Sequence, residues 1–171
     1  MVTGSIPQIT VRDAAEADVQ ALTAIKQPEV IHKDRLQEAL GSGFRYLVLL
    51  RGPEVIGFAC LVFRRPSSWS DANDRQHLPQ VVDLQVAEGQ RGRGYGSAFL
   101  HAIEQETVQA GYKQLYLAVE PLANARVYAL YERLGYRPLQ PEPYLKHWEF
   151  IDSSGDKHQG EQWIVDMVKP L

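Results

Sequence analysis

A short turn rich in glycine and arginine, at residues 91–96, carries the residue types best suited to chemistry. It reads Arg91-Gly92-Arg93-Gly94-Tyr95-Gly96 and joins an apolar run over residues 81–86 to a helical pattern that begins at Tyr95. Glycine lets the backbone approach a ligand closely, and the first turn of a helix offers unpaired N–H groups at the positive end of its dipole. With two arginines beside these groups, the turn is suited to binding phosphate.

Two common nucleotide-binding motifs do not fit this turn. A P-loop ends in Gly-Lys-Ser or Gly-Lys-Thr, whereas Gly96 is followed directly by Ser97, and a dinucleotide fingerprint needs Gly-x-Gly-x-x-Gly. The turn instead fits the pattern Arg/Gln-x-x-Gly-x-Gly/Ala through Arg91, Gly94 and Gly96. That pattern resembles the pyrophosphate loop of the GNAT superfamily of acyl-CoA-dependent N-acyltransferases. A purely structural glycine turn is the alternative for this motif taken alone.

A second stretch resembles another part of the same superfamily, the helix pattern Asn-x-x-Ala-x-x-Leu-Tyr-x-x-x-Gly-Phe/Tyr. The matching residues are, in order, Asn124, Val127, Leu130, Tyr131, Gly135 and Tyr136. Val127 stands where many members carry alanine, and Tyr136 where many carry phenylalanine. One helix and one strand separate the two motifs, and the order of elements fits from residue 9 to residue 168. The resemblance therefore covers nearly the whole chain.

The resemblance implies a binding site for acyl-CoA. The strand over residues 84–86 would pair with the pantetheine arm, and the turn 91–96, extended by Ser97, would bind the pyrophosphate. Asn124 would contact the cofactor arm, and Tyr131 would point at the sulfur of CoA; a helix cap and a core aromatic are the structural alternatives. The residues assigned to the cofactor are Leu84, Gln85, Val86, Arg91, Gly92, Arg93, Gly94, Tyr95, Gly96, Ser97, Asn124 and Tyr131.

The inferred reaction is direct transfer of an acetyl group from acetyl-CoA to a primary amine. Tyr131 would protonate the departing thiolate, and backbone N–H groups near Val86 would polarise the thioester carbonyl. Asp83 lies in an apolar strand, where an acid is costly unless it faces a cleft or a partner. It is the first candidate for binding or deprotonating the amine, with a salt-bridged structural role as the equal alternative. Relatives that modify protein N-termini carry glutamate in a Leu-x-Leu-Glu-Val motif, where this chain has Ala118.

Length and composition predict a single domain over residues 1–171. A hydrophobic share of 44% and a charged share of 23% are ordinary for a globular protein. The net charge of −3 gives no basic field for nucleic acid or an anionic membrane. We find no membrane-spanning stretch or signal-peptide pattern, so we expect a cytoplasmic protein. Cys60 has no partner for a disulfide or a metal site, and we expect it to be buried and the protein to bind no metal.

Periodicity and turn residues predict a mixed α/β (α+β) fold, and the resemblance implies that this fold is of the GNAT type. We expect a strongly twisted mixed sheet flanked by helices, in which strands 81–86 and 115–119 are parallel neighbours that splay to admit acyl-CoA. The other expected strands cover residues 9–11, 44–51, 55–63, 145–152 and 162–168. We expect helices after Asp13 to about 28, over 31–40, from 95 to Gly111, and from Asn124 to Gly135.

Two local features complete these predictions. Asp13 is expected to cap the first helix, with Glu16 as its capping-box partner. The long polar loop over residues 64–79 is expected to be functional or mobile. Within it, Trp69 is expected to pin the loop to the surface, with a substrate wall as the alternative, and His77 is expected at the surface.

The leading interpretation is an N-acetyltransferase whose acceptor is a small-molecule or peptide amine. Polyamines, amino acids, aminoglycoside-like amines, peptide N-termini and lysines all stay open as acceptors, and so does a homodimer. The first alternative is a non-catalytic GNAT-like module that senses acyl-CoA. The second is a phosphotransfer protein, although the chain has no P-loop lysine.

Overall fold

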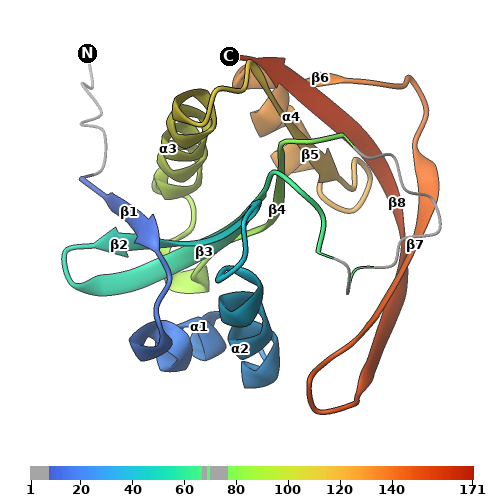
Figure 1. The fold of residues 1–171 in the computed structure, drawn as a ribbon. Coiled ribbons are helices and arrows are strands. Elements are labelled where there is room, and N and C mark those ends of the chain that lie inside the picture. The colour runs from blue at the N-terminus through green and yellow to red at the C-terminus, as the bar shows by residue number, and fades with distance from the viewer. Residues whose placement is uncertain (1–7, 67–68, 70–76) are drawn as a thin grey trace.

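A single twisted sheet with helices on both faces organises the molecule (Figure 1). The structure is a computed structural model and describes residues 8–66, 69 and 77–171. The elements are β1 (Thr10–Asp13), η1 (Glu16–Asp18), α1 (Val19–Ile25), α2 (Glu29–Glu38), β2 (Phe44–Arg51), β3 (Glu54–Val62), β4 (Gln80–Val86), η2 (Glu88–Gln90), α3 (Tyr95–Gln109), β5 (Gln114–Val119), α4 (Ala125–Arg133), β6 (Arg137–Pro138), β7 (Tyr144–Ile151) and β8 (Lys157–Pro170). Among the described helices, none combines the length and apolar character needed to cross a membrane.

The sheet is mixed, as the sequence predicts. Its strands follow the order β1-β2-β3-β4-β5-β8-β6, and β7 pairs with the N-terminal half of β8. The pairs β1–β2, β2–β3, β3–β4, β5–β8, β6–β8 and β7–β8 are antiparallel. Only β4 and β5, which the crossover helix α3 connects, run parallel. This arrangement confirms the predicted fold class and the predicted parallel neighbours.

The parallel strands part soon after they meet. Their pairing is confined to Gln80 and Tyr116, and the N–H of Tyr116 also donates to the carbonyl of Pro79 (2.9 Å). β5 pairs on its other side with β8 along its whole length, from Gln114 to Val119. The backbone edges of β4 and β5 that face each other are thus unpaired with one another toward their C-terminal ends. This confirms the predicted splay.

Two hydrophobic clusters separate the faces of the sheet. One joins α3 to the sheet through Phe99, Leu100 and Ile103, with Leu117 and Met167 from β5 and β8. The other, on the opposite face, packs Leu22 of α1 and Leu36 of α2 against β2 and β3 and includes the buried Cys60. Because side chains alternate along a strand, each residue of β5 or β8 belongs either to the α3 face or to the opposite, α2 face.

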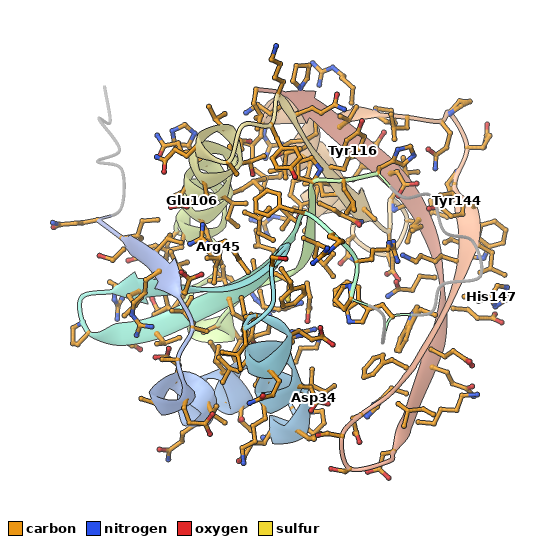
Figure 2. The ribbon with its side chains drawn as sticks, in the orientation of Figure 1. Asp34, Arg45, Glu106, Tyr116, Tyr144 and His147 are labelled. Atoms are coloured by element: carbon orange, nitrogen blue, oxygen red, sulfur yellow. The ribbon has the colours of Figure 1, made fainter. Side chains whose placement is uncertain are left out.

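A long hairpin of β7 and β8 extends from the sheet toward α2 (Figure 1). The sequence predicts β8 only from residue 162, but its polar first half, from Lys157, pairs with β7 to the end. The N–H of Ser153 in the hairpin turn donates to the carboxylate of Asp34 on α2 (3.0 Å). Figure 2 shows Asp34 on α2, and Tyr144 and His147 on β7. The hairpin therefore contacts the helix pair that lies across the sheet.

The predicted start of the first helix, with Asp13 as its cap and Glu16 as the capping-box partner, needs correction. Asp13 is not a helix cap: it ends β1, pairs with Leu47 and binds Arg45, since the strand pairing already satisfies its backbone. The first turn begins after Ala15, whose N–H donates to Asp18 instead.

Of the loop 64–79, residues 67–68 and 70–76 lie outside the described part of the chain. The Trp69 ring packs edge-on against Phe44 with centroids 5.7 Å apart, which confirms its pinning role. His77 is partly exposed, as expected for a surface histidine, and its ring stacks on that of Tyr116 with centroids 5.0 Å apart.

Candidate active site

The glycine turn adopts a backbone that glycine favours at two positions. Gly92 has φ 74° and Gly94 has φ 83°, both in the left-handed region. Gly94 is also the N-cap of α3, and no side chain caps the helix. The first N–H groups of α3 are therefore left for another acceptor. Arg93 is exposed beside them, so the turn has the geometry of an anion site.

The strand that precedes the turn is held by its neighbour β3 on one side. Gln85 pairs with Phe58, and Val86 pairs with Gly57. The side chain of Arg91 folds back, and its Nε donates to the carbonyl of Val86 (2.9 Å). This bond fixes the turn to the end of β4. Leu84, Gln85 and Val86 thus lie between the splay and the glycine turn, where a bound chain could pair with their free backbone edge.

A β-bulge interrupts β4 at Asp83. Cys60 and Phe58 of β3 face Val82 and Gln85 of β4, so β4 holds one extra residue there. Asp83 itself has φ 53°, a left-handed value that is unusual for a side chain other than glycine. Bulges re-aim side chains and are common next to active sites. This one turns the Asp83 carboxylate toward α2.

The Asp83 carboxylate is fully engaged with positive charge. It binds Lys26 Nζ (2.8 Å) and Arg35 Nη2 (2.7 Å), and it accepts a further bond from Gln85 Nε2 (2.9 Å). Burial alone would raise the pKa of Asp83, but the two cations outweigh it and hold that pKa at about 2. A carboxylate with so low a pKa is a weak base at neutral pH. The geometry therefore favours the salt-bridged alternative for Asp83.

Helix α4 begins and ends as the second motif predicts. Asn124 is its N-cap residue, but its side chain makes no capping bond and lies 3.4 Å from Glu120. At the other end, Gly135 has φ 98°, and the N–H groups of Gly135 and Tyr136 bind the last carbonyls of the helix. Asn124 thus holds the expected N-cap position, but its exposed amide donates to Glu120 and caps no N–H group of the helix.

Tyr131 projects from α4 onto the cluster on the α3 face. Its ring lies 5.9 Å from that of Tyr136, which is fully buried. Burial raises the pKa of the Tyr131 phenol, so the hydroxyl keeps its proton at neutral pH. Such a group is able to donate a proton but does not act as a base.

A second pair of polar side chains, which the sequence analysis missed, lies on the α2 face of the sheet. The Tyr144 hydroxyl on β7 donates to Asp166 Oδ2 on β8 (2.7 Å). Figure 2 shows Tyr144 at the start of β7 and Tyr116 on β5. Asp166 interrupts an apolar run over residues 164–168. Asp83 was identified in the sequence as a lone acid in an apolar strand. The same criterion applied to residues 164–168 would have identified Asp166.

Comparisons with known proteins agree with this geometry. The sequence pattern of the acetyltransferase (GNAT) family matches residues 12–136. No curated protein matches the chain.

Several solved structures share the fold over nearly the whole chain. Ribosomal-protein-alanine N-acetyltransferase from Brucella melitensis is 22% identical, with a TM-score of 0.67 over 95% of this chain and 99% of that one. The ribosomal-protein-S18-alanine N-acetyltransferase from Escherichia coli is 18% identical, with a TM-score of 0.63 over 95% and 94%. A phosphinothricin acetyltransferase from Sinorhizobium meliloti, in complex with acetyl-CoA, is 23% identical, with a TM-score of 0.63 over 95% and 88%.

These identities are too low to transfer a substrate, so the likeness to the solved structures concerns the fold alone. The family pattern is a separate observation, and it spans more than half of the residues. Because that pattern and the fold agree, the chain belongs to the acetyltransferase (GNAT) family.

Proposed function

We propose that this protein transfers an acetyl group from acetyl-CoA to a primary amine. The observation that carries the proposal is the splay of β4 and β5, which ends beside the glycine turn at the start of α3. An extended arm that pairs with the free edge of β4 would place its phosphates at that turn. Acetyl-CoA has this shape, and it is bound in the solved phosphinothricin acetyltransferase that shares the fold.

The residues assigned to the cofactor have distinct tasks in this proposal. The backbone of Leu84, Gln85 and Val86 would pair with the pantetheine arm, while N–H groups of residues 91–97 would bind the pyrophosphate. Asn124, whose amide caps no N–H group of α4, would bind the arm from the other side. An N–H near Val86 would stabilise the oxyanion that forms when the amine attacks.

Tyr131 is proposed as the acid that protonates the departing thiolate. Its burial keeps the phenol protonated, and it comes from the α3 face of the sheet. The proton acceptor on the amine side needs a second group. Asp83 stays a candidate by position, but its two cations make it a weak base.

Purified protein tests the proposal directly. Isothermal titration should detect acetyl-CoA binding, and CoA release should follow when an acceptor amine is added. A panel of spermidine, tyramine, lysine, kanamycin and a short peptide with a free N-terminus samples the open acceptor classes. Failure to bind acetyl-CoA would overturn the proposal. Binding without CoA release with any amine would favour the alternative of a non-catalytic acyl-CoA sensor.

A further inference from the structure

Asp166 is a buried carboxylate for which no described residue supplies a positive partner. Asp18, Glu104 and Asp152 are buried to a similar extent, and each contacts a basic side chain: Arg12 at 2.8 Å, Lys169 at 3.0 Å and His158 at 2.7 Å, respectively. Asp166 is 8% exposed. Among the described residues, the Tyr144 hydroxyl is the only side chain that bonds to its carboxylate, through Oδ2.

Such an arrangement leaves the negative charge of Asp166 without a charged partner among the described residues. A carboxylate removed from water is destabilised when no positive charge or sufficient hydrogen bonding replaces its hydration. The Tyr144 hydroxyl supplies one neutral hydrogen bond, and no hydrogen bond reaches Oδ1 from any residue that the structure describes. The carboxylate is thus held in place with one oxygen free to receive a cationic donor.

The position of Asp166 links it to the splay. Asp166 lies directly opposite Ala118 of β5, two residues beyond Tyr116, where β5 last pairs with β4. Side chains opposite each other in an antiparallel pair have Cβ atoms about 5 Å apart. The carboxylate therefore lies beside the part of β5 that has separated from β4.

Asp166 also lies on the face of the sheet opposite to that of Tyr131. Val165 and Met167 belong to the cluster under α3, so Asp166 between them points to the α2 face. Tyr131 packs on the α3 face. Among the described residues, the charged and titratable side chains on the α2 face near the splay include Asp83 with Lys26 and Arg35, Tyr144, Tyr116 and His77. Lys146 follows on the same face of β7 as Tyr144.

We propose that Asp166, oriented by Tyr144, binds the acceptor as a primary ammonium and takes its proton during acetyl transfer. The inference rests on the proposed function. It gives the reaction an acid and a base on opposite faces of the sheet, with the thioester in the splay between them. This arrangement suits a tetrahedral intermediate, in which the nitrogen that enters and the sulfur that leaves are different substituents of one carbon.

The proton balance of the step is complete. Asp166 takes one proton from the bound ammonium and passes it to water, which frees the lone pair of the nitrogen. The neutral amine nitrogen then forms a bond to the thioester carbon and gives its second proton to Asp166, because the nitrogen becomes far more acidic once it carries the new bond. The C–S bond then breaks, and Tyr131 gives a proton to the thiolate. The products are an N-acetyl amine and CoA; Asp166 loses its proton to water and Tyr131 regains one.

The test compares Asp166→Asn with two other variants on the amine that wild-type protein acetylates fastest. Asp83→Asn removes the competing carboxylate. Glu161→Gln is the matched control, because Glu161 lies on the same strand but is exposed and faces His147. For each protein we would measure the acetyl-CoA dissociation constant and kcat/KM for the amine from pH 6 to pH 10.

We expect Asp166→Asn to lower kcat/KM about 100-fold or more at pH 7, the usual range for a general base. The deficit should shrink as rising pH deprotonates the free amine. The acetyl-CoA dissociation constant should not change, and Glu161→Gln should behave as wild type. Asp83→Asn should cost less than Asp166→Asn at pH 7, or show a loss that does not shrink with pH.

Either of two results would overturn the inference: Asp166→Asn within about threefold of wild type at pH 7, or a large loss that is constant with pH. If Asp166→Asn does not fold, Tyr144→Phe decides instead, because it keeps the ring and the carboxylate but frees the latter to move. It should lower kcat/KM without changing acetyl-CoA affinity, and wild-type kinetics would refute the inference. A wild-type protein that releases no CoA with any amine would instead overturn the proposed function itself.

Discussion

At the scale of single residues, a glycine can be required for its backbone conformation or for the space that it leaves, and Gly94 and Gly96 of the glycine turn differ in this respect. Gly94 has a positive φ, so any substitution there strains the backbone as well as the ligand site. Gly96 differs: a Cβ built on it would meet only a methyl of Val86, at 3.9 Å. The fold leaves room for a side chain at Gly96. The lack of a side chain there is therefore better explained by a ligand that needs the space than by the fold.

Gly96→Ala should therefore fold normally and lose cofactor affinity. Alanine is the better helix former, so thermal stability without ligand should be unchanged or slightly higher. Acetyl-CoA affinity, measured by isothermal titration, should fall about tenfold or more, because the methyl group occupies space that phosphate needs. Gly89→Ala is the matched control, since its Cβ would also lie in open space but outside the proposed contact. Equal acetyl-CoA affinity in both variants would place the pyrophosphate elsewhere.

Tyr131→Phe tests the proposed protonation of the departing thiolate. The substitution keeps the ring that packs on the core and removes only the hydroxyl. If the hydroxyl protonates the thiolate, the single-turnover rate should fall about 10²-fold or more while acetyl-CoA affinity is nearly unchanged. Rapid-quench measurement of the first turnover checks this. A wild-type rate would mean that Tyr131 is a packing residue.

At the scale of elements, a close approach between β3 and β4 holds in position the strand that we propose pairs with the cofactor. Gly57 of β3 lies opposite Val86, and a Cβ at Gly57 would be 2.6 Å from the carbonyl oxygen of Gln85. That oxygen belongs to the backbone of β4 and cannot move without shifting the strand. The spacing of β3 and β4 thus sets where the edge of β4 is presented to a ligand.

Gly57→Ala should disturb stability and binding together. We expect a loss of about 1–3 kcal/mol in the free energy of unfolding, the usual cost of overpacking, and weaker acetyl-CoA binding. Urea denaturation and titration measure the two effects. Gly41→Ala is a suitable control, because its Cβ would make only an ordinary 3.4 Å contact. A Gly57→Ala protein as stable as wild type would show that β4 can shift away from β3 at little cost in free energy.

At the scale of the whole molecule, ion pairs connect segments that are far apart in the sequence. Lys26 and Arg35 bring α1 and α2 to β4 through Asp83. Glu104 of α3 binds Lys169 of β8 and accepts a bond from Tyr136. These contacts join both helical layers to the sheet.

Asp83 should give the protein an acid-sensitive component of stability. Its pKa is about 2 in the folded protein and near 4 in an unfolded chain. Because the folded-state pKa is the lower one, the contribution is fully present above about pH 5 and declines as the pH falls toward 2. It amounts to about 2 kcal/mol, with roughly 1 kcal/mol lost by pH 3.

The measurement is urea denaturation of wild type and Asp83→Asn between pH 6 and pH 3. The difference in free energy of unfolding between the two proteins should decrease by roughly 1 kcal/mol as the pH falls to 3. A difference that stays constant across this range would show that the ion pairs do not couple to folding.

The sequence by itself determined the features that depend on neighbouring residues. Glycines at 92, 94, 111 and 135 indicated turns and helix ends, and alternation or helical periodicity indicated the strands and helices that adopt them. The two motifs determined the family, because each is a local pattern. Errors at this level occurred where a distant strand intervened, as when β2 pairs with Asp13 and removes it from the helix start.

Only the tertiary structure decided which side chains meet. The partners of Asp83 lie 57 and 48 residues away, and no local pattern predicts that Lys26 and Arg35 would neutralise it. Likewise, Asp166 comes to lie beside the splay only because β8 pairs with β5 in a register that puts it opposite Ala118. Strand register is a property of the folded sheet, and a shift of one residue would turn this carboxylate to the α3 face. The proposed proton path therefore depends on packing between distant segments, which the linear order of residues does not specify.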